Sequence, residues 1–216
     1  MLAAVLQGRP GRAVQPSSID AIASSLGPAP PDLGEFSSPD GALTLLFTDI
    51  EDAATIRDRI GDQQWSDLVR DHGAMLERIV EHHDGNVVKS ESDGHMVAFS
   101  SAHAGLRCAI EIQRTFANHS PTSSGDQLRI RSGLHSGYVI VNADDFYGRN
   151  VVLAARVADR ARGGEILISE ALREYTATDP SFRFEPRGEF HFKGMLGEHN
   201  VYAVDWADGD DSPSRD

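Results

Sequence analysis

Apolar residues in the central part of the chain form either short uninterrupted runs or longer stretches of helical period. The short runs predict buried strands, and the periodic stretches predict amphipathic helices. Strands are predicted over 43–47, 86–89, 95–99, 128–135, 138–142, 165–168, 182–192 and 199–204, and helices over 62–83, 102–116 and 151–161. Tight turns are expected at Asp93-Gly94 and Ser136-Gly137, each between two strands. The order β-α-β-β-α-β, extended by a helix and a C-terminal hairpin, predicts an α+β fold of ferredoxin-like type.

The two ends of the chain differ in composition from this central part. Residues 1–42 are rich in Pro, Gly, Ser and Ala, which predicts a linker or arm with little to bury. One short helix is expected inside it, with Ser18 as its N-cap. Residues 207–216 are acidic and small, which predicts a disordered tail. We therefore expect a single folded domain over 43–206.

Charge narrows the classes of function. The 216 residues include 33 acidic and 20 basic side chains, for a formal net charge of −13. This balance argues against a nucleic-acid-binding protein, because such proteins neutralise phosphates with Lys and Arg. A polyanionic substrate must instead be held by a few local cations or by metal ions that carboxylates recruit. A single cysteine, Cys108, excludes an internal disulfide framework.

No apolar run approaches the roughly 20 residues that span a bilayer, and the opening 2–6 stretch is too short for a signal-peptide core. The sequence therefore predicts a cytoplasmic protein without a membrane span.

Two carboxylates occupy positions suited to a metal site. Asp49 lies at the end of the first apolar strand, and Asp93 lies at the tip of a predicted hairpin. If the two side chains converge, they provide the oxygen ligands that hard divalent cations prefer. The simpler alternative is a plain hairpin turn at Asp93-Gly94 and a helix N-cap at Asp49.

Several charged residues are further candidates, although each has an ordinary structural alternative. By strand alternation, Lys89 shares a sheet face with Asp93, but a strand lysine is commonly a solvated edge residue. Arg156, on the predicted helix that follows Asp145, has the delocalised charge that suits a phosphate, but helix arginines commonly face solvent. Lys193 lies where a strand meets a turn. The nine histidines contain no HxxxH pair and are interpreted as solvated.

Six short motifs, taken together, resemble one family. They are Phe47-Thr48-Asp49-Ile50, Lys89-Ser90-Glu91-Ser92-Asp93-Gly94, Gly133-Leu134-His135-Ser136-Gly137, Asp145-Phe146-Tyr147-Gly148, Ala154-Ala155-Arg156 and Gly163-Gly164-Glu165-Ile166. Their order and spacing resemble those of class III nucleotidyl cyclase catalytic domains, of the bacterial adenylyl cyclase type. The resemblance covers about 43–205, and so many separate motifs are unlikely to coincide by chance.

The resemblance implies a role for each candidate residue. Asp49 and Asp93, with the backbone carbonyl of Ile50, match the ligands of two Mg²⁺ or Mn²⁺ ions per site. Lys89 and Asp145 match the pair that reads adenine.

Two basic side chains complete the set of candidate residues. Arg156 matches the arginine that stabilises transition-state charge, and Lys193 matches the lysine that holds the terminal phosphates. The implied activity is adenylate cyclase, which converts ATP to 3′,5′-cyclic AMP and pyrophosphate. The implied assembly is a homodimer, in which the metal carboxylates of one subunit face Lys89, Asp145 and Arg156 of the other.

Departures from the family pattern keep a second hypothesis open. Val152 stands where such families carry Asn, and Asn150 lies about 200° away on the helix, so it cannot simply replace the missing amide. Ala53 and Ala54 replace small polar residues, and Ser92 replaces a glycine. The alternative is a degenerate cyclase-fold module that binds nucleotide or a partner with little or no turnover. A cyclase specific for GTP is a lesser option, which Lys89 and Asp145 disfavour.

Overall fold

The computed structural model describes residues 17–25, 42–118, 128–142 and 145–207, without the side chains of 140–142 and 145–147. The predicted tail, from residue 208 on, and the rest of the predicted arm lie outside the described residues. The elements in chain order are α1 (Ser18–Ser25), β1 (Ala42–Ile50), α2 (Ala53–Ile60), α3 (Asp62–His82), β2 (Asn86–Glu91), β3 (Gly94–Phe99), α4 (Ala102–Asn118), β4 (Ile130–Tyr138), β5 (Ile140–Asn142), β6 (Asp145–Tyr147), α5 (Arg149–Ala158), β7 (Ile166–Ser169), α6 (Glu170–Thr176), β8 (Arg183–Phe190) and β9 (His199–Asp205).

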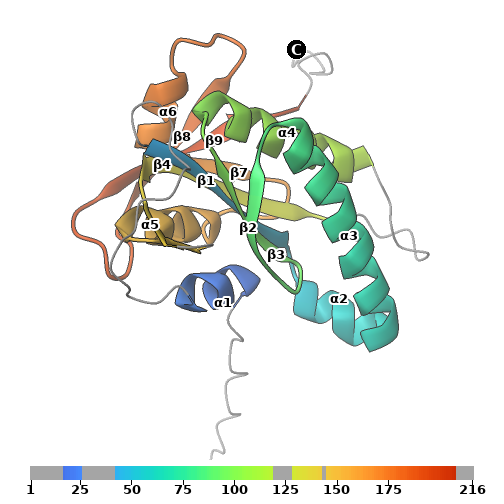
Figure 1. Ribbon diagram of the computed structural model, residues 1–216. Helices are drawn as coiled ribbons and strands as arrows, with labels where there is room; N and C mark the ends of the chain where they lie inside the picture. The colour runs from blue at the N-terminus through green and yellow to red at the C-terminus, as the bar shows by residue number, and fades with distance from the viewer. Residues whose placement is uncertain (1–16, 26–41, 119–127, 143–144, 208–216) are drawn as a thin grey trace, which may run out of the picture.

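A seven-stranded sheet in the order β2-β3-β1-β4-β7-β9-β8 forms the centre of the molecule (Figure 1). The strand β1 pairs antiparallel with both β3 and β4, and β4 pairs parallel with β7. The four strands β1 to β4, with the helices between them, confirm the predicted β-α-β-β-α-β core. The C-terminal hairpin of β8 and β9 is confirmed as well.

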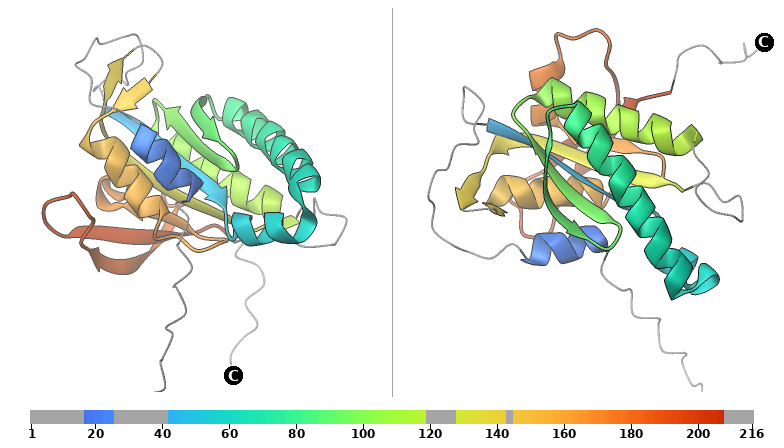
Figure 2. Two further views of the ribbon diagram at one scale, coloured as in Figure 1. Left: turned by 90° about the horizontal axis from the view of Figure 1, so that it is seen from below. Right: turned by 45° about the vertical axis from the view of Figure 1, so that its right-hand side comes forward.

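Helices cover both faces of this sheet (Figure 2), so the central strand β1 is buried along its whole length. Its residues alternate between the two faces. Leu45 and Phe47 pack with α1 and α5, whereas Leu46 and Ile50 pack with α3 and α4. By the same alternation, Asp49 belongs to the face that α1 and α5 cover.

The predicted hairpin at Ser136-Gly137 is wrong. The strand β4 runs through both residues to Tyr138, and β5 pairs with β6 instead of with β4. Glycine is needed here for close packing, because a Cβ on Gly137 would lie 2.6 Å from the side-chain nitrogen of Asn150 in α5. A Ser-Gly pair can therefore mark close contact with a helix as readily as a turn.

Sequence patterning also missed two helices, α2 and α6. The eight-residue α2 has no fully buried residue, so it lacks the apolar stripe by which a helix is recognised. The helix expected in the N-terminal arm is present as α1. Its first-turn contact comes from Ser17, whose Oγ accepts a hydrogen bond from the backbone N–H of Asp20 at 3.1 Å. Ser17 therefore has the capping role expected of Ser18.

The contact between β4 and α5 leads to a stability prediction. A methyl group on Gly133 would overlap the backbone of Ala158, which has no flexible end that can move aside. We expect Gly133→Ala to lower the free energy of unfolding by about 1–3 kcal/mol, measured by urea denaturation. A matched control is Gly73→Ala in α3, where the added carbon would lie at an ordinary 3.6 Å from His95. Equal stability of the two variants would contradict this packing.

His72 leads to a prediction about acid stability. It is buried in α3 between Phe116 and His95, at ring-centroid distances of 4.8 and 5.4 Å. Neither of its ring nitrogens has a hydrogen-bond partner among the described residues. Burial lowers its pKa to about 3, and the neighbouring His95 acts in the same direction. The folded protein therefore keeps His72 neutral, whereas the unfolded chain takes up a proton near pH 6.5.

The unfolded state is thus favoured as the pH falls from about 6.5 towards 3. Between pH 7 and pH 5, we expect His72 alone to remove about 2 kcal/mol from the free energy of unfolding. The variant His72→Leu is expected to lose about that much less over the same interval in urea denaturation. His191→Leu, at an exposed position, serves as the control and is expected to match the wild type. An unchanged pH dependence in His72→Leu would contradict the prediction.

In the described part of the chain, every helix falls short of the length or apolar character that crossing a membrane requires.

Candidate functional site

A cavity of about 1000 Å³ lies where β1 ends, beside α1, the start of α2, the β2–β3 turn and the end of α5. Both candidate carboxylates, Asp49 and Asp93, line it, and so does Ile50. Six basic side chains among the described residues line it as well, although the chain is acidic overall. These six are Arg57, Arg131, Arg156, Arg160, Arg162 and Lys193. The cavity thus concentrates the local positive charge that a polyanionic ligand needs.

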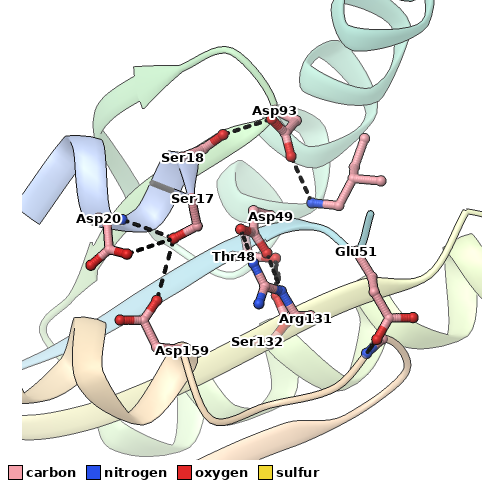
Figure 3. Close-up of polar contacts among 12 residues, drawn as sticks. Ser17, Ser18, Asp20, Thr48, Asp49, Glu51, Asp93, Arg131, Ser132 and Asp159 are labelled. Atoms are coloured by element: carbon pink, nitrogen blue, oxygen red, sulfur yellow. Dashed lines mark hydrogen bonds and ion pairs between the residues drawn. The ribbon is translucent and has the colours of Figure 1, made fainter. Parts of the chain in front are cut away.

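Asp49 lies at the cavity wall with only 2% of its surface exposed, and it is paired with Arg131 of β4. The two residues stand opposite each other in the β1–β4 register. The guanidinium forms two hydrogen bonds with the carboxylate, and the bond from Nε to Oδ1 measures 2.8 Å (Figure 3). Burial raises the pKa of Asp49 to about 6, although Arg131 lowers it. The carboxylate is therefore mostly ionised at neutral pH.

Asp93 lies in the β2–β3 turn and is equally buried, with 2% exposed. Its Oδ2 accepts a hydrogen bond from the backbone N–H of Ile50 at 3.0 Å, which ties the turn to the end of β1. Its Oδ1 accepts a hydrogen bond from the hydroxyl of Ser18 in α1 at 2.7 Å. The backbone of Ser92 has a φ of 54°, a left-handed conformation that glycine would adopt without strain. Despite Ser92 in place of glycine, the turn forms.

The two carboxylates form a donor set that fits a divalent cation. The negative charge of Asp93 raises the pKa of Asp49, so the two groups interact electrostatically. Both carboxylates line the cavity at the end of β1, where Asp49 points towards Arg131 and Asp93 towards Ser18 (Figure 3). Each already accepts hydrogen bonds from positively polarised groups. Their all-oxygen character matches the preference of Mg²⁺ and Mn²⁺.

Arg156 extends from α5 towards the same cavity. Its Nη1 donates to Asp20 of α1 at 2.8 Å and to Asp159 at 3.0 Å. Its Nε is buried and has no hydrogen-bond partner among the described residues. Lys193 is exposed at the cavity edge, in the segment after β8. The structure therefore brings four of the predicted side chains, Asp49, Asp93, Arg156 and Lys193, to one cavity.

Of the predicted adenine-reading pair, only Lys89 has a described side chain. Lys89 is half-buried in β2 and is not among the described residues that line the cavity. Asp145 begins β6, but its side chain lies outside the described part of the structure. The backbones of β2 and β6 approach each other, although the two strands belong to different sheets. Within one subunit, Lys89 therefore does not line the cavity that Asp49 and Asp93 line.

The start of α2 forms another part of the cavity wall. Ala53 and Ala54 line the cavity, and the N-cap residue Asp52 makes no side-chain capping bond. The first N–H groups of a helix lack intrahelical acceptors, so they suit phosphate oxygens. The substitution of polar residues by alanine leaves these backbone donors in place.

The missing amide of the family pattern is not supplied by Asn150. Its side chain donates to the carbonyl of Tyr138 at 2.6 Å, and its Oδ1 is 3.1 Å from Nε2 of His135. Neither Asn150 nor Val152 is among the described residues that line the cavity.

Four charged or polar residues of the site were missed in the sequence: Arg131, Ser18, Asp20 and Asp159. Strand alternation over 129–131 could have suggested Arg131, but only the β1–β4 register places it on Asp49. The contacts of Ser18 and Asp20 span 75 and 136 residues along the chain, so no local pattern marks them. Burial, with the nearby charge of Asp20, raises the pKa of Asp159, whereas Arg156 lowers it.

The interpretation of all histidines as solvated is wrong for His72, His95 and His135, which are buried. His82 and His83 lie near each other, with ring centroids 5.1 Å apart, and both face Glu111.

The chain was compared with known protein families and sequences. The model of the adenylate and guanylate cyclase catalytic domain matches residues 37–205. Putative adenylate cyclase 3 of Rhizobium meliloti is 30% identical over 137 residues, which cover 63% of this chain and 23% of that protein. The serine/threonine-protein kinase pkn2 of Myxococcus xanthus is 29% identical over 131 residues, which cover 60% of this chain and 16% of that protein. The chain thus spans less than half the length of these relatives.

Solved structures agree in fold. The catalytic core of a rhodopsin-guanylyl cyclase with converted specificity, in complex with ATPαS, aligns with a TM-score of 0.71 at 22% identity, over 76% of this chain and 96% of that one. The adenylyl cyclase CyaB from P. aeruginosa aligns with a TM-score of 0.68 at 23% identity, over 79% of this chain and 97% of that one.

Proposed function

Because the chain belongs to the adenylate and guanylate cyclase catalytic domain family, we propose that it is an adenylate cyclase. It converts ATP to 3′,5′-cyclic AMP and pyrophosphate in a site shared by two subunits of a homodimer. The observation that carries this proposal is the convergence of Asp49 and Asp93 on a cavity lined by six basic side chains. The donors suit divalent cations, and the basic groups suit a triphosphate.

Each residue then has a chemical task. Asp49, Asp93 and the carbonyl of Ile50 would hold two Mg²⁺ or Mn²⁺ ions, which would supply acidification of the ribose 3′-hydroxyl and charge neutralisation of the pyrophosphate. Arg156 stabilises the negative charge that develops on the α-phosphate, and Lys193 holds the terminal phosphates. The N–H groups at the start of α2 orient the β- and γ-phosphates.

Base selection rests on Lys89 and Asp145. A lysine donor and an aspartate acceptor complement the N1 acceptor and the exocyclic amine of adenine, whereas guanine presents the reverse pattern. A wrong base leaves buried polar groups unpaired, which costs more than a lost apolar contact. We therefore infer that ATP is preferred to GTP.

The position of Lys89 supports a dimer. It lies outside the cavity that holds Asp49 and Asp93 of its own chain. A second subunit related by a twofold axis can supply the missing base contacts, and symmetry then produces two equivalent sites. Activity should rise with protein concentration, since the monomer lacks a complete site.

The alternative, a degenerate module with little or no turnover, is favoured by one specific observation. The amide of Asn150 is engaged by Tyr138 and His135, so nothing in this helix replaces the amide lost at Val152. Loss of one such hydrogen bond is expected to lower the catalytic rate by about 10²–10³, which predicts slow turnover rather than none.

The test is a side-by-side assay of purified protein with ATP and with GTP, in the presence of Mn²⁺, with identification of the products. The proposal predicts cyclic AMP as the main product. Nucleotide binding in calorimetry without any cyclic product would favour the degenerate module, and cyclic GMP as the main product would overturn the assignment of ATP.

A further inference from the structure

The helix α1 forms one wall of the candidate catalytic cleft, which Ser18 and Asp20 line. It lies against β1, β2, β3 and α5, on the sheet face that carries Asp49 (Figure 2). In sequence it belongs to the N-terminal arm, and residues 26–41 separate it from β1. Its position is therefore a long-range tertiary contact and does not follow from its place in the chain.

Apolar contacts seat α1 on the sheet. Ile19 and Ile22, one turn apart, are fully buried and share a cluster with Phe47, Met96 and other core residues. Ser24 and Ser25, at the end of the helix, are exposed. One side of α1 thus forms part of the core, although the helix has only eight residues.

Polar contacts place α1 on the catalytic groups themselves. The Ser18 hydroxyl donates to Asp93 at 2.7 Å, and the Asp20 carboxylate accepts from Arg156 at 2.8 Å (Figure 3 shows the Ser18 contact). Ser17 Oγ lies 3.4 Å from Asp159, the other partner of Arg156.

These contacts resemble those that a bound substrate complex requires. Asp93 receives a positively polarised hydrogen where a cation would bind, and Arg156 receives a carboxylate where a phosphate oxygen would bind. The same oxygen lone pairs and N–H groups cannot serve both α1 and a metal–nucleotide complex at full strength. Binding of one therefore weakens binding of the other.

We propose that α1 is an internal inhibitor that engages Asp93 and Arg156 at the wall of the cleft and competes for them with the metal–nucleotide complex. This inference rests on the proposed function, since it assigns the same cleft to substrate. The active form has α1 released, so that Asp93 no longer accepts from Ser18 and Arg156 no longer donates to Asp20. The apparent affinity for the metal–nucleotide complex is then reduced by the fraction of molecules in which α1 is seated.

Two properties make such release reasonable. An isolated helix of eight residues is marginal in water, so α1 depends on its contacts with the cleft. The chain over 26–41 keeps α1 tethered, so its return is intramolecular and does not depend on concentration.

The inhibitor acts on both sites of the proposed dimer. Asp93 of one subunit belongs to one site, whereas Arg156 of the same subunit belongs to the other. One copy of α1 contacts both residues, so when it is bound it engages one residue of each site. Its release therefore affects both sites.

The first test uses the wild-type chain and hydrogen–deuterium exchange. Addition of Mn²⁺ with a non-hydrolysable ATP analogue is expected to increase amide exchange in 18–25 by about tenfold or more, while exchange in β1 stays slow. Unchanged or increased protection of α1 at saturating ligand, with binding verified by calorimetry, would overturn the proposal.

The second test compares two variants that add the same charge to the same helix. Ile22→Asp places a carboxylate in the buried side of α1, whereas Ser24→Asp places one on the exposed side. We expect Ile22→Asp to tighten Mn²⁺–nucleotide binding in calorimetry by about tenfold and to raise the rate at low substrate, with Ser24→Asp unchanged. Unchanged or weaker ligand binding by folded Ile22→Asp would overturn the proposal. If Ile22→Asp does not fold, the exchange experiment on the wild type decides.

Failure of this inference differs from failure of the proposed function. Cyclic AMP formation with α1 protected at saturating ligand refutes the inhibitor and leaves the cyclase. Release of α1 by metal and nucleotide without any cyclic product, in the wild type and in Ile22→Asp, refutes the cyclase and leaves α1 as a gate on a nucleotide-binding site.

Discussion

Asp93→Asn is expected to lower the rate of cyclic AMP formation by about a thousandfold at saturating ATP and Mn²⁺. The substitution keeps the size of the side chain and leaves an oxygen that can accept the N–H of Ile50. It removes the negative charge that, in the proposed site, holds the cations together with Asp49. The fold is therefore expected to persist while the metal-dependent chemistry is lost. Product formation and Mn²⁺ binding, measured by calorimetry on the same preparation, provide the check.

A matched control for this substitution is Glu189→Gln, which removes one negative charge from an exposed position in β8. It is expected to keep the wild-type rate. A rate for Asp93→Asn within threefold of this control, with weakened Mn²⁺ binding or without it, would show that the carboxylate is not needed for turnover.

Arg156→Ala is expected to reduce kcat by about a hundredfold or more and to change the KM for ATP much less. In the proposed mechanism, the guanidinium stabilises negative charge that develops on the α-phosphate in the transition state, so its removal should affect chemistry more than binding. Binding of Mn²⁺ should be retained, because Asp49 and Asp93 are intact. Steady-state kinetics with ATP and calorimetry with Mn²⁺ separate these effects.

Arg187→Ala is the control, since Arg187 forms an ion pair with Glu165 away from the cavity. It is expected to leave kcat unchanged. Loss of activity in Arg156→Ala through a raised KM alone would assign Arg156 to ground-state binding.

Much of the fold was predictable because local patterns report local structure. The uninterrupted apolar run at 43–47 identified the central strand, and it is buried on both faces as expected. Glycine was the ambiguous signal. Gly137 indicated a turn in the sequence, but it serves close packing against Asn150 in the structure. Only tertiary contacts distinguish the two uses.

The site was predictable to the extent that each residue lies in a short motif. Asp49, Asp93, Arg156 and Lys193 were found in this way and share the cavity. Arg131 was not found, because its pairing with Asp49 depends on the register of β1 and β4. Residue spacing along the chain does not determine that register. The short helix in the arm was predicted, but its packing was not. The composition of the arm indicated little to bury, whereas α1 buries Ile19 and Ile22 against the sheet.

The most direct test of the shared, metal-assisted site is to mix two inactive variants. Asp93→Asn lacks a metal carboxylate and Arg156→Ala lacks the transition-state cation, yet in one subunit both residues line the same cavity. If the working site takes its carboxylates from one subunit and its arginine from the other, a mixed dimer contains one intact site. An equimolar mixture, allowed to exchange subunits, is then expected to recover about a quarter of the wild-type activity, since half of the dimers are mixed and each has one of two sites intact. No recovery above either variant alone, with mixed dimers verified by mass spectrometry, would contradict the account.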